Sequence, residues 1–142
     1  MKKAFTLFEL LVSISIIGIL VAVASTSYSG AQKKARDSRR MEDLNSIQKA
    51  LELYYSTNPT SPFTYPSVSG GQAVGMTPVY IQSWPRDPKT GIPYVYNFNV
   101  PAAGNYCVGV SLDYPVGNCP NPTTCVGIGA SAASYYCVKS QQ

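Results

Sequence analysis

The stretch that decides the fold is Met1–Ala24, MKKAFTLFELLVSISIIGILVAVA. Two lysines lead into a run of 20 residues, Phe5–Ala24, in which Glu9 is the only charged side chain. Twenty helical residues rise about 30 Å, which matches the hydrocarbon thickness of a bilayer. A carboxylate inside such a run costs roughly 2.5–3.5 kcal/mol on insertion scales, so its presence predicts a partner for the charge.

Two ordinary interpretations of this stretch leave Glu9 unexplained. A secretory signal peptide has a shorter apolar core and a small-residue cleavage site, for which Ala22-Val23-Ala24 would be the candidate. A signal anchor would use Lys2 and Lys3 to hold the N-terminus in the cytoplasm. The apolar run is long and the helical pattern continues beyond it, which argues against cleavage near residue 24.

The segment Lys2–Val12, KKAFTLFELLV, resembles the N-terminus of type IV pilins and of the pseudopilins of type II secretion and DNA-uptake machines. In that family a prepilin peptidase removes a basic leader before a Phe, the new amino terminus is N-methylated, and a Glu four residues further on is kept. The resemblance implies cleavage between Ala4 and Phe5, methylation at Phe5, and an assembly role for Phe5 and Glu9. The chain has Ala4 where the family usually has Gly, and Thr26 where many members have a Pro that loosens the helix.

The charge of Glu9 fits the processing that this resemblance implies. Cleavage before Phe5 would create an ammonium group one helical turn from Glu9, and opposite charges attract strongly in a low-dielectric setting. A single subunit could therefore pair its own Glu9 carboxylate with its own Phe5 amine. In the family's filaments the Glu of one subunit pairs with the Phe amine of a neighbour. We therefore expect the charge of Glu9 to be compensated when a subunit docks into a filament.

Composition indicates a membrane helix with one small exported domain. The 118 residues after Ala24 suit a single small domain. The formal charge of the whole chain is +4. Without residues 1–4 the chain has 9 Lys and Arg and 7 Asp and Glu, so its formal charge is +2, which is too small to indicate a nucleic-acid partner. The chain has no His, 13% charged residues and 11 Tyr, which favours an exported surface over a cytosolic enzyme.

Four cysteines lie near the end of the chain and predict two disulfides in an oxidising compartment: Cys107, Cys119, Cys125 and Cys137. A zinc site is the poorer interpretation, because the spacing contains no CxxC pair and no His completes a site. The nested pairing, 107–137 with 119–125, is preferred because Cys107 and Cys137 have the same phase in their strands. The sequential pairing, 107–119 with 125–137, stays open.

The helical pattern continues from Ser25 to Ser56 and ends at Asn58-Pro59, because Pro cannot extend a helix. Small or apolar residues recur three or four apart as one stripe: Ala31, Ala35, Met41, Leu44, Ile47, Leu51 and Tyr54. One continuous helix of about 50 residues, roughly 75 Å long, is therefore expected.

A basic cluster, KKARDSRR at residues 33–40, follows the apolar run. It is interpreted as a solvated helix neck, partly paired with Asp37, Glu42 and Asp43 at neighbouring turns. Contacts with anionic headgroups, with acids of an adjacent subunit or with DNA are the sharper alternatives.

Residues 57–91 are rich in Pro and Gly and predict a loop with short ordered pieces. Within it, Thr77-Pro78 indicates a helix cap and first position, opening a turn or two of helix through Gln82. The segment Trp84–Tyr94, WPRDPKTGIPY, resembles the Asp-Pro…Gly-x-Pro-Tyr segment of major pseudopilins and some bacterial pilins. Its Asp87 and Thr90 are suited to binding local backbone amides, and its Gly to a positive φ.

Three alternating segments predict strands. Their expected inward faces are Tyr94, Tyr96, Phe98 and Val100; then Tyr106, Val108, Val110 and Leu112; and finally Tyr136 and Val138. We expect an antiparallel sheet of about three strands, with these faces packed on the Leu44–Tyr54 stripe.

Nothing in the sequence supports catalysis, and no catalytic residue, cofactor or metal is predicted. Without His, acid–base chemistry would fall on isolated carboxylates, and no two of them form a patterned pair: Glu42, Asp43, Glu52, Asp87 and Asp113. Major pseudopilins can hold calcium in a C-terminal loop. Here Asp113 is the one acid after position 87, whereas calcium takes six to eight oxygen ligands. Asp113 is interpreted as a turn residue.

The expected fold is α+β and pilin-like, a long N-terminal helix packed on a small antiparallel sheet. The expected parts are a leader at 1–4, a transmembrane or filament-core helix at 5–24, its amphipathic continuation at 25–56, and a small globular head at 57–142 with disulfides.

The resemblance implies a structural subunit of a type IV pilus-like filament serving motility, adhesion or DNA uptake. A major pseudopilin of type II secretion and a membrane-anchored binding module that never polymerises are the alternatives. Implied partners are copies of the chain, prepilin peptidase/methyltransferase, the inner-membrane assembly platform and the membrane, whereas a nucleic-acid partner stays open. The precursor is expected to cross the cytoplasmic membrane once with its head outside the cytoplasm, and then to enter an extracellular filament or a periplasmic pseudopilus.

Overall fold

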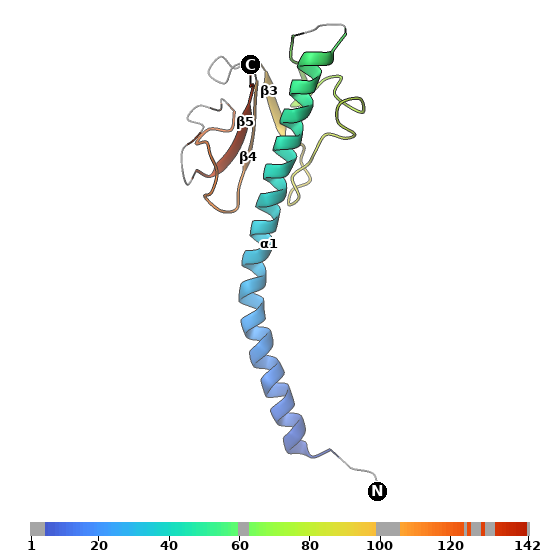
Figure 1. Cartoon of the computed structure of the whole chain (residues 1–142). Helices are drawn as coiled ribbons and strands as arrows, with labels where there is room; N and C mark the ends of the chain where they lie inside the picture. Colours follow the sequence, from blue (N-terminus) through green and yellow to red (C-terminus); the bar gives the residue numbers. More distant parts are fainter. Residues whose placement is uncertain are drawn as a thin grey trace. The chain divides into compact units, whose positions relative to one another are not determined.

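A computed structural model describes residues 5–59, 63–98, 106–123, 125, 129 and 133–141 (Figure 1). Its elements are one helix and five strands: α1 (Leu7–Thr57), β1 (Val68–Ser69), β2 (Gln72–Ala73), β3 (Val95–Phe98), β4 (Tyr106–Ser111) and β5 (Tyr135–Lys139). The chain divides into two compact units, Met1–Lys34 and Ala35–Gln142. The α+β, pilin-like fold class is confirmed.

The predicted continuous helix is also confirmed, because α1 contains 51 residues without a Pro. The helix ends where the sequence predicts, one residue before Asn58-Pro59. In its last turn the hydroxyl of Thr57 donates to the Leu53 carbonyl at 2.6 Å, and the Asn58 N–H donates to the Tyr54 carbonyl at 3.0 Å. These bonds satisfy part of the backbone that a helix end leaves unpaired.

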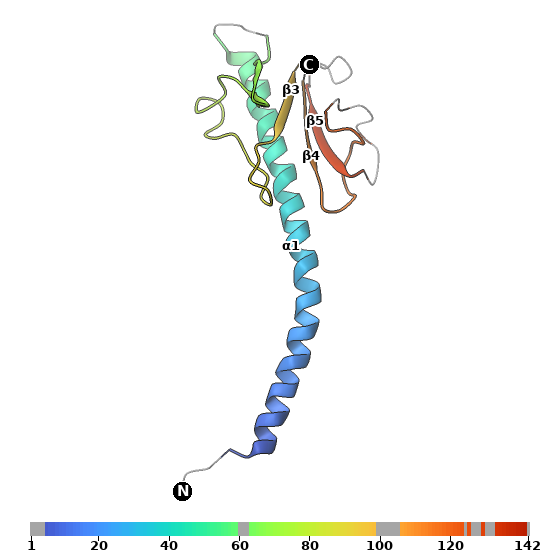
Figure 2. The same cartoon turned by 180° about the vertical axis from the view of Figure 1, so that it is seen from behind.

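The core of the second unit lies between residues 35–57 of α1 and a three-stranded antiparallel sheet in the order β3-β4-β5 (Figures 1 and 2). Leu44, Ile47 and Leu51 of the predicted stripe are fully buried there. From the sheet, the predicted inward residues are buried against them: Tyr94, Tyr96, Tyr106, Val108, Val110 and Val138. The side chain of Phe98 and all of Val100 lie outside the described residues.

Both edges of this sheet are covered by neighbouring loops, which blocks pairing with further strands. Beyond β3, the Tyr96 N–H donates to the Gly71 carbonyl, in the turn of the β1–β2 hairpin, at 2.7 Å. Beyond β5, residues 117–119 make isolated bridges to Ala133 and Tyr135. Gly117 is required at this edge, because a Cβ there would collide with the Tyr135 carbonyl.

The short helix predicted from Thr77-Pro78 to Gln82 is wrong, because these residues form turns and bends. The N–H groups of Tyr80 and Ile81 both donate to the Met76 carbonyl, so one turn closes and is not continued. Met76 is fully buried and the Tyr80 ring lies against Tyr54, with centroids 5.1 Å apart. Anchoring in the core, rather than helix propensity, sets the path of this segment.

Two disulfides are present, as predicted, but both pairings considered from the sequence are wrong. The bonds join Cys107 to Cys125 and Cys119 to Cys137, with Cα–Cα separations of 5.7 and 6.0 Å. Cys107 and Cys137 do share one face of the sheet, yet Cys107 pairs with Lys139 and Cys137 with Gly109. This two-residue offset makes the cysteines diagonal neighbours, about 7–8 Å apart, which is too far for a disulfide.

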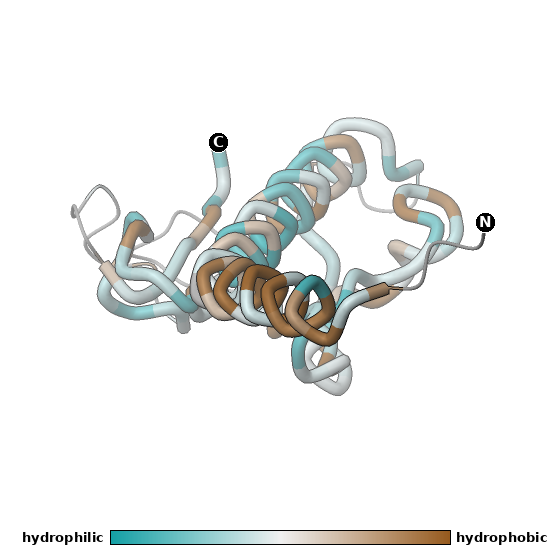
Figure 3. The backbone as a smooth tube through the Cα atoms, turned by 90° about the horizontal axis from the view of Figure 1, so that it is seen from below, coloured by the Kyte–Doolittle hydropathy of each residue, from teal (hydrophilic) through white to brown (hydrophobic). Residues whose placement is uncertain are grey.

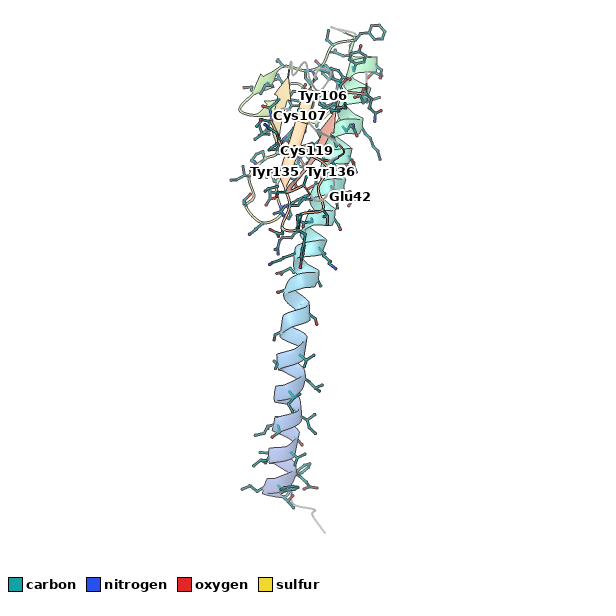
Figure 4. The ribbon with its side chains drawn as sticks, turned by 90° about the vertical axis from the view of Figure 1, so that its left-hand side faces the viewer. Glu42, Tyr106, Cys107, Cys119, Tyr135 and Tyr136 are labelled. Carbon is teal, nitrogen blue, oxygen red and sulfur yellow. A yellow bond between two sulfur atoms is a disulfide. The ribbon has the colours of Figure 1, made fainter. Side chains whose placement is uncertain are left out.

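The loop after Cys119 instead folds over this face of the sheet, where Cys107 and Cys119 are labelled in Figure 4. Pro122 lies directly against Gly109, and a Cβ at Gly109 would approach Pro122 to 2.6 Å. The four cysteines are all buried and form a second, smaller cluster together with Tyr135. The loop therefore passes across the sheet and is bonded to both β4 and β5.

Candidate functional site: the apolar helix and its acidic residue

The first 17 residues of α1, Leu7–Val23, are mostly apolar, and their apolar side chains are exposed. Figure 3 colours the backbone of this part of the helix largely brown, the colour of hydrophobic residues. The exposed fractions include 84% for Leu7, 59% for Ile14 and 65% for Val23. By length and composition α1 is able to cross a membrane, a property that signal sequences share. Nothing in the first unit buries this surface, so it requires lipid or a protein partner.

Glu9 lies at the start of this apolar helix, in a capping box with Thr6. The Thr6 backbone N–H and hydroxyl both donate to Glu9 Oε2, at 3.0 and 2.8 Å. In return the Glu9 N–H donates to the Thr6 hydroxyl oxygen at 3.2 Å. The pattern Thr-x-x-Glu before an apolar run is present in the sequence, although no role was predicted for Thr6.

This geometry holds the carboxylate of Glu9 at the N-terminal end of α1, where the helix dipole favours negative charge. Phe5 precedes the helix and is 83% exposed, and Ala4 lies outside the described residues. Thr26 belongs to the unbroken helix, although its side chain is not described. The predicted acid is therefore preorganised at the helix start, beside the residue that processing would expose.

The serines within the apolar run and directly after it donate their hydroxyl groups to the helix's own backbone. Ser13, Ser15 and Ser25 donate to the carbonyls of Glu9, Leu11 and Val21, at 2.8, 2.9 and 2.8 Å. Donation to the carbonyl one turn back satisfies a hydroxyl without a partner helix. These side chains are thus compatible with an apolar environment around the helix.

The second unit contains a buried ion cluster that sequence reasoning missed. Arg40 of α1 is 3% exposed, and its guanidinium donates to Asp87 at 2.6 Å and to Asp37 at 2.8 Å. Arg36 forms a further ion pair with Asp113 at 2.7 Å. The prediction of a solvated helix neck is therefore wrong for Asp37 and Arg40, because both side chains are buried. The predicted pairing between charges of the helix is confirmed for the same two residues. The spacing of the Asp37–Arg40 pair was visible in the sequence, but its distant partners were not.

The acids of this cluster also organise the backbone around them. Asp37 accepts the backbone N–H groups of Asp113 and Tyr114, at 2.9 and 3.0 Å. As predicted, Asp87 accepts local amides, those of Lys89 and Thr90, at 2.8 Å each. Burial alone would raise the pKa of Asp87, but bonds from Arg40 and from these amides lower its pKa to about 2.

The remaining acids are placed apart from one another. Asp43 accepts the hydroxyl of Tyr94 at 3.0 Å, and Glu52 accepts the hydroxyls of Tyr65 and Tyr106 at 2.9 Å each. Within the described parts of the chain, no group of three or more His, Cys, Asp or Glu is placed to hold a metal ion. Asp43 and Glu52 therefore hold tyrosine hydroxyl groups of the second unit.

Comparison with known proteins places this helix in a recognised setting. Residues 1–25 match the family described as prokaryotic N-terminal methylation motif. The chain is 30% identical over 86 residues to type II secretion system core protein G of Pectobacterium carotovorum subsp. carotovorum, covering 61% of this chain and 53% of that protein. With core protein G of a Klebsiella michiganensis strain it shares 29% identity over 99 residues, covering 63% of this chain and 70% of that protein.

A type IV major alpha-pilin of Moraxella bovis is 29% identical over 85 residues, covering 60% of this chain and 54% of that pilin. The chain thus spans about half the length of the first curated relatives it matches. Among solved structures there is no significant match. The relatives are subunits of pilus and secretion systems, and the chain carries the N-terminal motif of prepilins.

Proposed function

We propose that this chain, a relative of type IV pilins and of type II secretion core protein G, is the precursor of a filament subunit. Prepilin peptidase cuts it between Ala4 and Phe5, and the new amino terminus is methylated. The subunit then packs into a type IV pilus-like fibre through its N-terminal helix, while the head forms the outer surface. Motility, adhesion or DNA uptake belongs to that fibre.

The observation that carries the proposal is the exposed apolar surface of α1 together with the acid at its start. In the membrane, lipid covers the surface, but Glu9 remains a charge beside hydrocarbon. In a fibre, neighbouring helices cover the same surface and bring an amine of Phe5 close to a carboxylate. Assembly thus replaces a local hydrogen-bonded arrangement with an ion pair in a low-dielectric setting.

The first experiment is mass spectrometry of the N-terminus, on protein expressed together with a prepilin peptidase. The expected product starts at a monomethylated Phe5. A product that keeps Met1, or that starts near Ser25, contradicts the proposal and supports a plain signal anchor or a cleaved signal peptide. Phe5→Ala tests whether the methylated residue itself matters once cleavage has been verified.

The second experiment measures assembly. Glu9→Ala is expected to abolish fibres in sheared fractions while the precursor still inserts and is cut. Glu42→Ala is the matched control, because it removes an exposed acid of α1 that lies outside the apolar part of the helix, Leu7–Val23. Normal fibres from Glu9→Ala would remove the role proposed for this acid, and a processed wild type without fibres would favour a binding module that does not polymerise.

A second candidate function is that of a major pseudopilin in type II secretion. It is supported by the core protein G relatives, one of which aligns over 70% of its length. Both candidates share the same processing and assembly steps, so location separates them. Electron microscopy of intact cells is expected to show long surface fibres for a pilus, whereas short periplasmic fibres and a secretion defect on deletion indicate the pseudopilus.

A further inference from the structure

Phe63 presents an aromatic ring at the surface of the second unit from an unusual backbone conformation. The residue is 70% exposed, and its φ of 60° lies in the left-handed region that bulky residues rarely adopt. Its backbone N–H donates to the Tyr55 carbonyl, near the end of α1, at 2.9 Å. The ring meets the Tyr55 ring edge-on with centroids 5.8 Å apart, and Tyr55 stacks on Tyr65 at 4.7 Å. Phe63 is therefore an exposed apolar group that is held in one position.

A hollow of about 330 Å³ lies between the start of β3 and the end of β4. The pairing of β3 with β4 ends at Val95 and Gly109, whereas β4 pairs with β5 as far as Ser111. Two residues further along, the same register would pair Pro93 with Ser111, but Pro has no N–H to donate, so the ladder ends before it. Ile92 and Val95 are exposed and form an apolar wall of the hollow together with Pro93.

The charged side chains that line the hollow are paired with one another: Arg40, Asp87, Lys89 and Asp113. Arg40 donates to Asp87 at 2.6 Å, and Lys89 Nζ lies 3.8 Å from Asp113 Oδ1. Because their formal charges sum to zero, the lining does not favour an ionic ligand. The apolar wall is the part of the lining that a ligand would complete, and the exposed Lys89 ammonium beside it favours the face of an aromatic ring.

We infer that, in the fibre, the Phe63 ring of one copy enters the hollow of a second copy and packs against Ile92 and Val95. This inference rests on the proposed function. Phe63 is bonded to Tyr55 and the hollow is lined by Arg40, so the 15 residues of α1 between these positions, a rise of about 22 Å, separate the ring from the hollow. A contact between two different surfaces leaves one of each free on every added copy, so it extends a fibre instead of closing a dimer.

The size of the contact selects a second copy as the occupant of the hollow. An aromatic residue buries about 150–250 Å², whereas stable complexes of free proteins bury about 1,200–2,000 Å². One ring is therefore too small a contact to capture a free partner. Copies that are already joined through the apolar part of α1, Leu7–Val23, meet at a high effective concentration, so a small contact between their second units is sufficient.

The test replaces Phe63 with the photoreactive analogue p-benzoyl-phenylalanine in cells that assemble fibres. Irradiation of the fibres is expected to give covalent dimers, and peptide mapping is expected to place the new bond at residues 92–95 of the second copy. The same analogue at Val79, which is exposed but does not line the hollow, is the control and should not reach these residues. Bonds from position 63 to other residues, or to lipid alone, overturn the inference.

Phe63→Gly removes the ring and keeps the path of the backbone, because Gly adopts a positive φ without strain. The amount of fibres in sheared fractions is expected to fall about tenfold, as for a residue that carries binding energy at an interface. The urea unfolding midpoint of the unassembled chain should change little, because the ring is mostly exposed. Phe63→Tyr keeps the ring and should assemble like the wild type.

Ile92→Ser tests the other side of the same contact, because it weakens the apolar wall at an exposed position. The double variant Phe63→Gly/Ile92→Ser should lose no more fibres than Phe63→Gly alone, since both changes remove one contact. Losses that add up overturn the assignment of this pair.

Fibre formation by the processed wild type separates this inference from the proposed function. Normal fibres from Phe63→Gly, with bonds from position 63 to residues outside the hollow, contradict the inference and leave the filament proposal intact. A processed wild type that forms no fibres overturns both.

Discussion

Arg40 and Asp87 form a buried ion pair across 47 residues of sequence, with Nε and Oδ2 2.6 Å apart. Because Arg40 also binds Asp37, and Asp37 holds the backbone of the turn at residues 113–114, one guanidinium connects α1 to two separate loops. Buried pairs add little net stability compared with apolar packing, but removal of one partner leaves an uncompensated charge. The cluster therefore fixes how the loops lie on the helix.

Replacement of Arg40 by Met is expected to destabilise the second unit by about 3–5 kcal/mol, because Asp37 and Asp87 remain buried without their cation. The measurement is urea unfolding of the detergent-solubilised chain, followed by the fluorescence of Trp84, its only tryptophan. Arg39→Met is the control, since an exposed neighbour should change the unfolding free energy by less than about 0.5 kcal/mol. Equal effects of the two variants would show that the buried pairs are not the cause.

Acid is expected to weaken the second unit between about pH 4 and pH 2. The folded-state pKa of Asp87 lies near 2, below its ordinary value of 3.8, so its stabilising contribution is complete above the unfolded pKa and is lost as pH falls through the folded one. A difference of this size corresponds to about 2 kcal/mol. Asp113 adds in the same direction, because the bond from Arg36 lowers its pKa.

The measurement is the unfolding free energy of the wild type and of Asp87→Asn from about pH 5 to pH 2. The variant should be less stable than the wild type at about pH 5, and its stability should depend less on pH below that. Parallel pH profiles for the two proteins would rule out Asp87 as the titrating group.

Peptide mapping of the oxidised chain is expected to recover the crossed disulfides. Chymotryptic cleavage after Leu112 and Tyr135 separates Cys107 and Cys137 from the peptide that carries Cys119 and Cys125. The crossed pattern links all three peptides, and fragmentation between positions 119 and 125 assigns each bond. A separate peptide closed by 119–125, with 107 joined to 137, would restore the nested pattern.

The cysteine pairing shows where sequence reasoning stops. Strand phase correctly placed Cys107 and Cys137 on one face, because side chains alternate with a period of two. This alternation gives the face on which a side chain lies, but not the register in which two strands pair. The register places Cys137 opposite Gly109. Gly109 carried the missing information, since a residue without a Cβ leaves room for another chain segment to cross the sheet, but one sequence does not say which segment crosses.

The helix and the core were predictable because their signals are periodic and local. The stripe that includes Leu44, Ile47 and Leu51 needs only a count of residues. The ion cluster was not predictable, because its partners come from three distant segments and their meeting depends on the finished fold. The capping box of Thr6 and Glu9 lies between these cases. Its pattern is present in the sequence, whereas the prediction for Glu9 rested on its charge alone.

Thr6→Val is expected to loosen the first turn of α1, because valine keeps the shape of threonine and removes both hydroxyl bonds to Glu9. Loss of an N-cap costs about 1 kcal/mol, which corresponds to roughly fivefold faster exchange in detergent micelles of the hydrogen-bonded amides of this turn, those of Glu9 and Leu10. Thr6→Ser keeps the hydroxyl and should exchange like the wild type. Unchanged exchange in Thr6→Val would mean that the capping box does not stabilise this turn.

Gly109→Ala tests the packing of the loop on the sheet. The added Cβ would lie 2.6 Å from Pro122 Cβ and 2.7 Å from its Cα, and backbone atoms cannot move aside as a flexible side chain can. Overpacking of this kind costs typically 1–3 kcal/mol, so the variant should unfold at lower urea concentration, with a larger fraction of free thiols after expression. Ser111→Ala, an exposed position two residues along β4, is the control and should leave both quantities unchanged. If Gly109→Ala matched that control, Pro122 would not rest on the sheet as described, and the crossing of the loop over β4 would lose its physical basis.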